Sequence, residues 1–149
     1  EKRALLEPDF RTLAEAGLDV DIEEYLRGEA ERIVLGLEFA ALHRDYDLLL
    51  TPTQPTLPPT VETRYHSPEF DRWRHAVPFT VPFNLTGQPA ASIPCGVSDS
   101  GLPIGLQIVG PRFADHLVLR AARAYEAARA TPLAGPALRA SVESFMADG

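Results

Sequence analysis

Several residue types that build chemical sites are scarce in this sequence. The chain has one cysteine, Cys95, which excludes an internal disulfide and a metal site made from several thiolates. Its basic residues are thirteen arginines and a single lysine, Lys2. No apolar run approaches the roughly 20 residues that a membrane helix needs, and no signal-peptide pattern opens the chain. We therefore expect no membrane partner and a cytoplasmic location.

The overall charge argues against a nucleic-acid partner. The net charge is −7 and the isoelectric point is near 5, so the surface would repel a phosphate backbone. Hydrophobic content of 45% and charged content of 23% are ordinary values for a globular protein. A chain of 149 residues is in the size range of one domain.

The polar residues do not form a recognisable catalytic or metal motif. The histidines, at 43, 66, 75 and 116, show neither a His-x-x-x-His pair nor a His-Glu-x-x-His motif, so we expect no metal and no cofactor. No serine lies in a glycine-flanked elbow and no two serines are adjacent. Ser92 falls inside an expected strand, where its hydroxyl is expected to bond a neighbouring backbone group. No residue is assigned a catalytic role.

Apolar spacing and end signals predict the helices. A helical stretch over residues 4–16 is interrupted by Pro8, and a better-defined helix spans residues 21–44, with Asp21 and Glu24 as an acidic capping box. Residues 79–85 suggest one or two helical turns ended by Gly87. A further helix, capped by Asp115, spans residues 115–128. A last short helix is expected at residues 142–146.

Three short apolar segments predict strands, at residues 47–51, 90–94 and 104–109. Turn residues at 98–101 separate the last two, which are expected to form a hairpin-like or closely neighbouring pair. Four prolines between residues 52 and 59 make the segment after the first strand an extended loop, of the kind that lines sites. Helices and strands together predict an α/β fold. Three strands would leave a sheet edge unpaired, so we expect part of the sheet to come from another segment or chain.

Two amides have alternative roles. Gln107 has apolar neighbours on its strand, so its side chain is expected to be buried and bonded, to a neighbouring loop in preference to a substrate. Asn84 either closes the turn around Gly87 or faces a cleft.

The order of several motifs resembles that of the amidase signature family. The motifs are DLLLTPT at 47–53, TxxxNxxGxPA at 80–90, SxPxG at 92–96 and GLPxGxQxxG at 101–110. The resemblance covers about residues 47–128, and the long helix before Asp47 also fits the family. It implies that the chain is the C-terminal part of an amidase-signature fold, with a mixed β-sheet covered by helices.

The resemblance also implies a reaction, and it implies that the catalytic groups lie in a different part of the protein from this chain. Members of the family cleave or transfer amide-bound acyl groups with two serines and a lysine base, without a metal. The only lysine here is Lys2 and the paired serines do not occur, so the catalytic N-terminal part is expected to be absent from residues 1–149. This chain alone is then inactive. Its expected partners are a small-molecule amide and the missing N-terminal half.

By the same resemblance, this chain supplies the wall of the substrate pocket. The expected substrate-binding residues are Thr53, Trp73, Phe79 and Asn84. Together with Phe83, the aromatic residues favour a hydrophobic acyl or aryl group. The amidotransferase branch often has an acidic residue where Val77 stands, which favours a free-standing amidase here.

Two other functions remain open. The chain is alternatively a non-catalytic interaction or binding module on the same scaffold, or the A subunit of a tRNA-dependent amidotransferase. We also expect self-association into a homo-oligomer, because strand edges and apolar faces that meet the missing half would be exposed.

Overall fold

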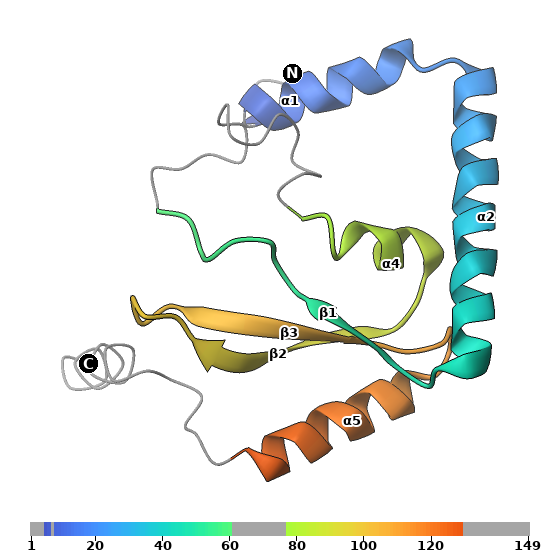
Figure 1. The fold of residues 1–149 in the computed structure, drawn as a ribbon. Helices are drawn as coiled ribbons and strands as arrows, with labels where there is room; N and C mark the ends of the chain where they lie inside the picture. The colour runs from blue at the N-terminus through green and yellow to red at the C-terminus, as the bar shows by residue number, and fades with distance from the viewer. Residues whose placement is uncertain (1–4, 7, 61–76, 130–149) are drawn as a thin grey trace.

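The fold is an open arrangement of helices around one small sheet (Figure 1). The computed structural model describes residues 5–6, 8–60 and 77–129. In chain order the elements are α1 (Pro8–Ala16), η2 (Gly17–Asp19), α2 (Ile22–Asp45), β1 (Leu49–Pro52), α4 (Val81–Thr86), β2 (Ala90–Val97), β3 (Pro103–Val109) and α5 (Asp115–Ala128). This mixture of helices and strands confirms the α/β class. The helix expected at residues 142–146 lies outside the described residues.

The sheet has three strands in the order β1-β3-β2. β3 pairs with both neighbours, so that Leu49 and Ala90 both lie opposite Val109. All three expected strands are present, with ends shifted by up to three residues. Every strand pair in the described part of the chain is antiparallel, so the parallel pairs of a mixed sheet do not occur there.

The β2–β3 hairpin is closed by the expected turn. The Ser98 backbone N–H donates to Leu102 O at 2.8 Å, and the Ser98 hydroxyl accepts from the Leu102 N–H at 3.1 Å. Gly101 has a φ of 83°, a left-handed conformation that a glycine adopts without steric cost. The local turn chemistry therefore accounts for this connection.

Proline occurs in both outer strands of the sheet. Pro52 is the last residue of β1. Pro94 lies within β2, and the register with β3 shifts between Pro94 and Gly96. Arg129, which follows α5, donates a hydrogen bond to the Pro94 carbonyl. Within the described ranges neither β1 nor β2 pairs with a further strand, as expected for a sheet with unpaired edges.

Helix α5 covers one face of the sheet and makes the core (Figure 1). Ile93, Ile108 and Val118 are buried together at 6%, 3% and 3% exposure. The helix spans the expected residues, but the prediction that Asp115 caps it was wrong. Ala114 occupies the N-cap position without a side-chain bond, and Asp115 lies in the first turn, where its charge complements the helix dipole.

Helix α2 begins as its sequence predicts but carries an uncovered apolar stripe. The Asp21 side chain accepts from the Glu24 N–H at 2.8 Å, which is the expected cap. The apolar stripe of α2 consists of Ile22, Leu26, Ile33 and Leu37, which are 71%, 59%, 57% and 66% exposed. Four residues at helical spacing normally mark a buried face. No residue of α2 is buried in the described part of the chain.

Helix α1 begins at Pro8 and is not interrupted by it, because a proline at the first helical position leaves no required hydrogen bond unmade. With η2 it extends across the top of the view, away from the sheet (Figure 1). No helix in the described ranges has the length and apolar character needed to cross a membrane.

Candidate functional site

A row of polar side chains crosses the sheet on the face opposite α5. Thr51 of β1, Gln107 of β3 and Ser92 of β2 lie directly opposite one another in the pairing register. Because side chains alternate between the two faces of a strand, Thr53 and Gly105 share this face with them. The core residues Ile93 and Ile108 point the other way, toward α5. The second face therefore carries hydroxyl and amide groups where the first carries a hydrophobic core.

Gln107 is the buried centre of this row. It is only 4% exposed. Its Nε2 donates to Thr51 Oγ1 at 2.8 Å and to the Phe79 carbonyl at 2.8 Å. The expectation that this amide bonds a neighbouring loop is confirmed, because Phe79 lies in the segment that leads into α4.

Thr53 and Ser92 form a hydroxyl pair at the outer part of the row. Their oxygens are 2.7 Å apart, and the Thr53 N–H donates to Gly105 O at 3.0 Å. The expectation that Ser92 bonds a backbone group was wrong, since its partner is the Thr53 side chain. The pair is possible because Gly105 has no side chain: a Cβ there would lie 2.8 Å from Thr53 Oγ1.

Helix α4 carries Asn84 and packs beside α2. Phe83 is 5% exposed, and its ring lies 5.1 Å from that of Phe39. This burial places Phe83 in the packing between the helices, whereas we expected it to line a pocket. Asn84 is exposed, and the turn after α4 is closed by the Gly87 N–H donating to Phe83 O at 2.9 Å. The Asn84 side chain therefore does not close that turn.

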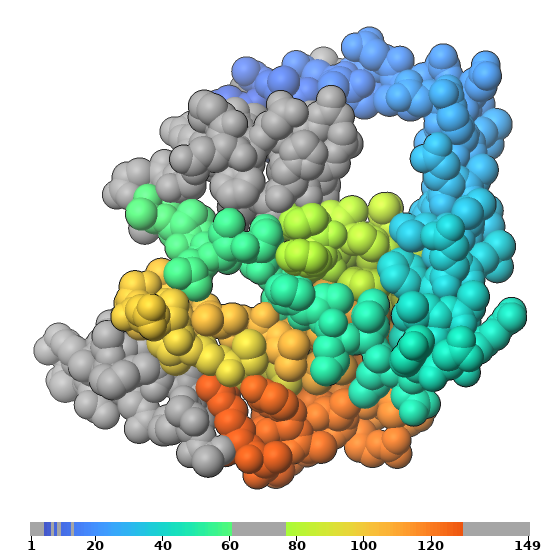
Figure 2. Space-filling model, in the orientation of Figure 1, coloured from blue at the N-terminus to red at the C-terminus, as the bar shows by residue number. Residues whose placement is uncertain are grey.

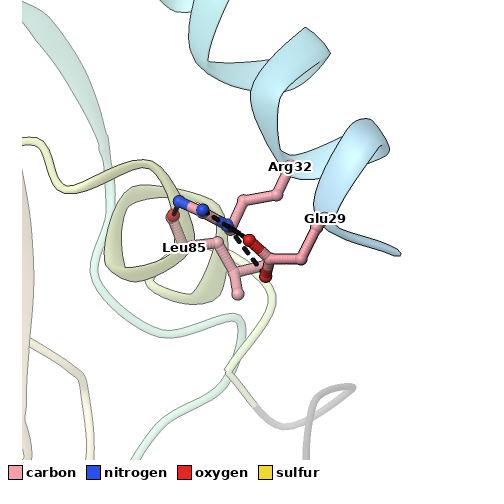
Figure 3. Close-up of polar contacts among 3 residues, drawn as sticks. All are labelled: Glu29, Arg32 and Leu85. Carbon is pink, nitrogen blue, oxygen red and sulfur yellow. Dashed lines mark hydrogen bonds and ion pairs between the residues drawn. The ribbon is translucent and has the colours of Figure 1, made fainter. Parts of the chain in front are cut away.

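An arginine on α2 holds the end of α4 (Figure 3). Arg32 Nη1 donates to the Leu85 carbonyl at 3.4 Å, and Arg32 Nη2 lies 2.7 Å from Glu29 Oε2. The hydrogen bond from Arg32 lowers the pKa of Glu29 below its ordinary value of 4.5. A cation beside the last carbonyls of a helix complements the helix dipole.

The predicted site residues are distributed unevenly. Thr53 belongs to the hydroxyl pair, and Phe79 is half-buried with its carbonyl bonded to Gln107. Trp73 and Lys2 lie outside the described residues. The space-filling view shows the surface hollowed between the segment after β1 and the β2–β3 hairpin (Figure 2). Within residues 8–60 and 77–129, no three His, Cys, Asp or Glu side chains gather as a metal site would require.

Sequence reasoning missed the roles of Thr51, Ser92 and Gly105 in this site. A signal was available: Thr51 and Thr53 are two residues apart, as are Gly105 and Gln107, so each pair must share a face. The pairing of β1 with β3, which brings Thr51 beside Gln107, was not readable from the chain.

The sequence of this chain is similar to that of known proteins. A sequence profile described as Amidase matches residues 7–119, which is most of the chain. The chain belongs to the amidase family. The match begins well before residue 47, so the family likeness includes α1 and α2 as well as the sheet.

Relatives of this amidase chain are considerably longer than it is. The A subunit of the glutamyl-tRNA(Gln) amidotransferase of Dehalococcoides mccartyi (strain CBDB1) is 39% identical over 104 residues, which are 70% of this chain and 21% of that protein. The chain thus spans about a fifth of the length of the curated relatives it matches.

Solved amidase structures share the fold. A crystal structure of an amidase superposes with a TM-score of 0.72 at 34% identity, covering 82% of this chain and 29% of the other. A bacterial aryl acylamidase of the amidase signature enzymes superposes with a TM-score of 0.71 at 28% identity, covering 85% of this chain and 27% of the other. The resemblance read from the sequence motifs is confirmed.

Proposed function

We propose that this chain forms the C-terminal scaffold and substrate-side wall of an amidase that hydrolyses carboxylic amide C–N bonds. The acyl group passes to a serine, releasing ammonia or an amine, and water then releases the acid. The serines and the lysine that perform this chemistry belong to an N-terminal part outside residues 1–149. The family match over residues 7–119 carries the proposal.

The wall consists of the polar face of the sheet and the start of α4. In this proposal Thr53, Phe79 and Asn84 contact the substrate, and Trp73 stays a prediction outside the described residues. The Thr53–Ser92 pair supports the assignment, because two hydroxyls 2.7 Å apart keep one proton free to donate to a carbonyl. The hollow between the segment after β1 and the β2–β3 hairpin supports it further (Figure 2).

The expected partners are a small-molecule amide and the remainder of the amidase domain. The apolar stripe of α2 supports the second partner, since a row of exposed apolar residues on a family helix is a surface that another element covers. We place the protein in the cytoplasm as part of the same proposal.

The test compares two proteins. The product of the complete reading frame that encodes this chain is expected to release ammonia from amides such as benzamide and acetamide, and to react with a fluorophosphonate that labels activated serines. Residues 1–149 expressed alone are expected to do neither. Hydrolysis by residues 1–149 alone would contradict the division of labour, and an inert full product would contradict the amidase assignment.

A second function has specific support, because several of the similar relatives are A subunits of glutamyl-tRNA(Gln) amidotransferases. In that case the full product would act within a larger assembly and transfer ammonia from an amide donor. Glutamine separates the two functions. Ammonia release from glutamine that depends on added partner proteins favours the amidotransferase, whereas hydrolysis of benzamide by the full product alone favours the free-standing amidase.

A further inference from the structure

Gln107 joins three segments that are far apart in the sequence. Its side chain bonds Thr51 on β1 and the backbone of Phe79, while its own backbone belongs to β3. We propose that Gln107 is a positioning residue, which fixes the Phe79 segment and α4 against the polar face of the sheet. This inference rests on the proposed function, because Phe79 and Asn84 belong to the proposed substrate wall.

The hydrogen-bond partners determine how the Gln107 amide is oriented. The Phe79 carbonyl can only accept, so the Gln107 group facing it must be the NH₂ and not the oxygen. The second Nε2 hydrogen is directed to Thr51 Oγ1. Both donors of the amide are therefore used, and a flipped amide would leave the Phe79 carbonyl facing another acceptor.

The bonded carbonyl lies immediately before α4. Phe79 is two residues ahead of Val81, where the helix begins, and the Asn84 N–H donates to Thr80 O at 3.1 Å inside its first turn. The far end of α4 is held by Arg32 through the Leu85 carbonyl (Figure 3). Helix α4 is thus tied at its start to the sheet and at its end to α2.

The hydrogen bonds that hold the two ends of α4 differ in their exposure to water. Gln107 is 4% exposed, whereas the Arg32 side chain is 42% exposed. Water therefore competes for the bond from Arg32 to Leu85 and hardly for the bond from Gln107 to Phe79. Loss of the Gln107 amide leaves the Phe79 carbonyl and the Thr51 hydroxyl, both part-buried, without this hydrogen-bond partner. The hydrogen bond from Gln107 to Phe79 therefore determines where Asn84 lies relative to the Thr53–Ser92 pair.

The first experiment uses Gln107→Met in the product of the complete reading frame, because methionine keeps the length of glutamine and removes both donors. Hydrogen exchange is expected to quicken by about tenfold at the Asn84 and Gly87 amides. The sheet amides of Thr53 and Gly110, which donate to Gly105 O and Pro89 O, are expected to keep their rates. Unchanged rates in α4, or equal quickening in the sheet, would overturn the inference.

Thr51→Val is the matched control. It keeps a β-branched side chain on β1 and removes only the hydroxyl acceptor. The bond from Gln107 to the Phe79 carbonyl remains, so exchange in α4 is expected to stay within about twofold of the original rate. A Thr51→Val effect as large as that of Gln107→Met would overturn the role given to the Phe79 bond.

Gln107→Glu supplies a readout that simple loss of packing would not produce. Its carboxylate cannot donate to Phe79, but the protonated carboxyl can, and burial favours protonation. After correction for the intrinsic pH dependence of exchange, α4 protection is expected to be low at about pH 8 and to recover toward about pH 5. Protection that does not recover on acidification would count against the hydrogen bond as the cause.

Activity separates this inference from the proposed function. In Gln107→Met the KM for benzamide is expected to rise about tenfold with kcat within about twofold, because the wall moves and the catalytic groups do not. Unchanged KM beside altered exchange would reduce Gln107 to a structural role and overturn the inference. A wild-type product that hydrolyses no amide would refute the proposed function, while the exchange results would still decide the role of Gln107.

Discussion

The absence of a side chain at Gly105 allows two hydroxyls to meet above β3. A Cβ at this position would lie 2.8 Å from Thr53 Oγ1, closer than such atoms approach in proteins, and 3.1 Å from Ser92 Oγ, which is tighter than most Cβ contacts. Ser92 lies on β2, and Thr53 directly follows β1 with its N–H bonded to Gly105 O, so both side chains have little room to move away. The glycine is needed here for space and not for an unusual backbone conformation.

We therefore expect Gly105→Ala to destabilise the protein by about 1–3 kcal/mol, because the new methyl group overpacks the polar face. Urea unfolding of the full reading-frame product would measure this change. Gly96→Ala is the matched control on β2, since a Cβ there would meet nothing within 4 Å. Equal stability of the Gly105 and Gly96 variants would show that Thr53 and Ser92 move aside for the methyl group without a cost in stability.

At the scale of single residues, the sequence predicted Thr53, Phe79 and Asn84 as site residues only through the family resemblance. It also predicted that Gln107 would be buried and bonded to a loop, because a lone amide between Leu106 and Ile108 must find partners. The partners themselves, Thr51 and the Phe79 carbonyl, depend on strand pairing and a loop path. Neither leaves a pattern in the local sequence.

At the scale of elements, the connections that local chemistry governs were predicted correctly. The Asp21 cap of α2 and the Ser98–Gly101 turn each depend on residues within four positions of one another. The strand order β1-β3-β2 was not predicted, because the pairing of β1 with β3 joins residues 54 to 60 positions apart. The Asp115 cap failed because the helix began one residue earlier than a cap at that position requires.

Two glycines in the helices differ in what a side chain would cost. Gly87 ends α4 with a φ of 70°, whereas Gly28 lies inside α2, where an added Cβ would meet nothing within 4 Å. Gly87→Ala is expected to destabilise the protein by about 1–2 kcal/mol, and Gly28→Ala to stabilise it by about 1 kcal/mol. Thermal unfolding of the two variants would measure these changes, and a shared sign would contradict the expectation.

The link between α2 and α4 is expected to weaken in acid. The hydrogen bond from Arg32 lowers the pKa of Glu29 in the folded protein. The stabilisation from the Glu29–Arg32 pair is therefore complete above the ordinary pKa of 4.5 and is lost as the pH falls through the lower folded value. Hydrogen exchange at Gly87 between about pH 5 and pH 3 would follow the loss. Glu29→Gln is the control and should remove this part of the pH dependence; identical profiles would refute the link.

At the scale of the whole molecule, the apolar stripe of α2 departs from an ordinary folded surface, because it exposes four large apolar side chains on one helix. We expect residues 1–149 alone to self-associate and to bind a hydrophobic dye, because this stripe has no cover in the described part of the chain. Ile33→Glu combined with Leu37→Glu is expected to reduce both effects. Sedimentation velocity and dye fluorescence would measure them.

Arg27→Glu is the matched control, since it also changes the net charge by −2 but alters an exposed polar position of the same helix. In the full reading-frame product, the Ile33 and Leu37 changes should instead destabilise folding, by about 1.5–3 kcal/mol for each side chain that the remaining domain buries. A clean monomer of residues 1–149 without dye binding would contradict the idea that the stripe needs a cover.

The prolines of the outer strands determine which surfaces can take part in this self-association. Strand edges were expected to contribute to it. However, β1 is four residues long and ends at Pro52, and β2 contains Pro94 and a shift in its register with β3. A proline offers no N–H to an incoming strand, and a bulge twists the edge away from it. Copies of the chain should therefore meet through helices and remain dispersible, and growth into cross-β fibrils is disfavoured at both borders of the sheet.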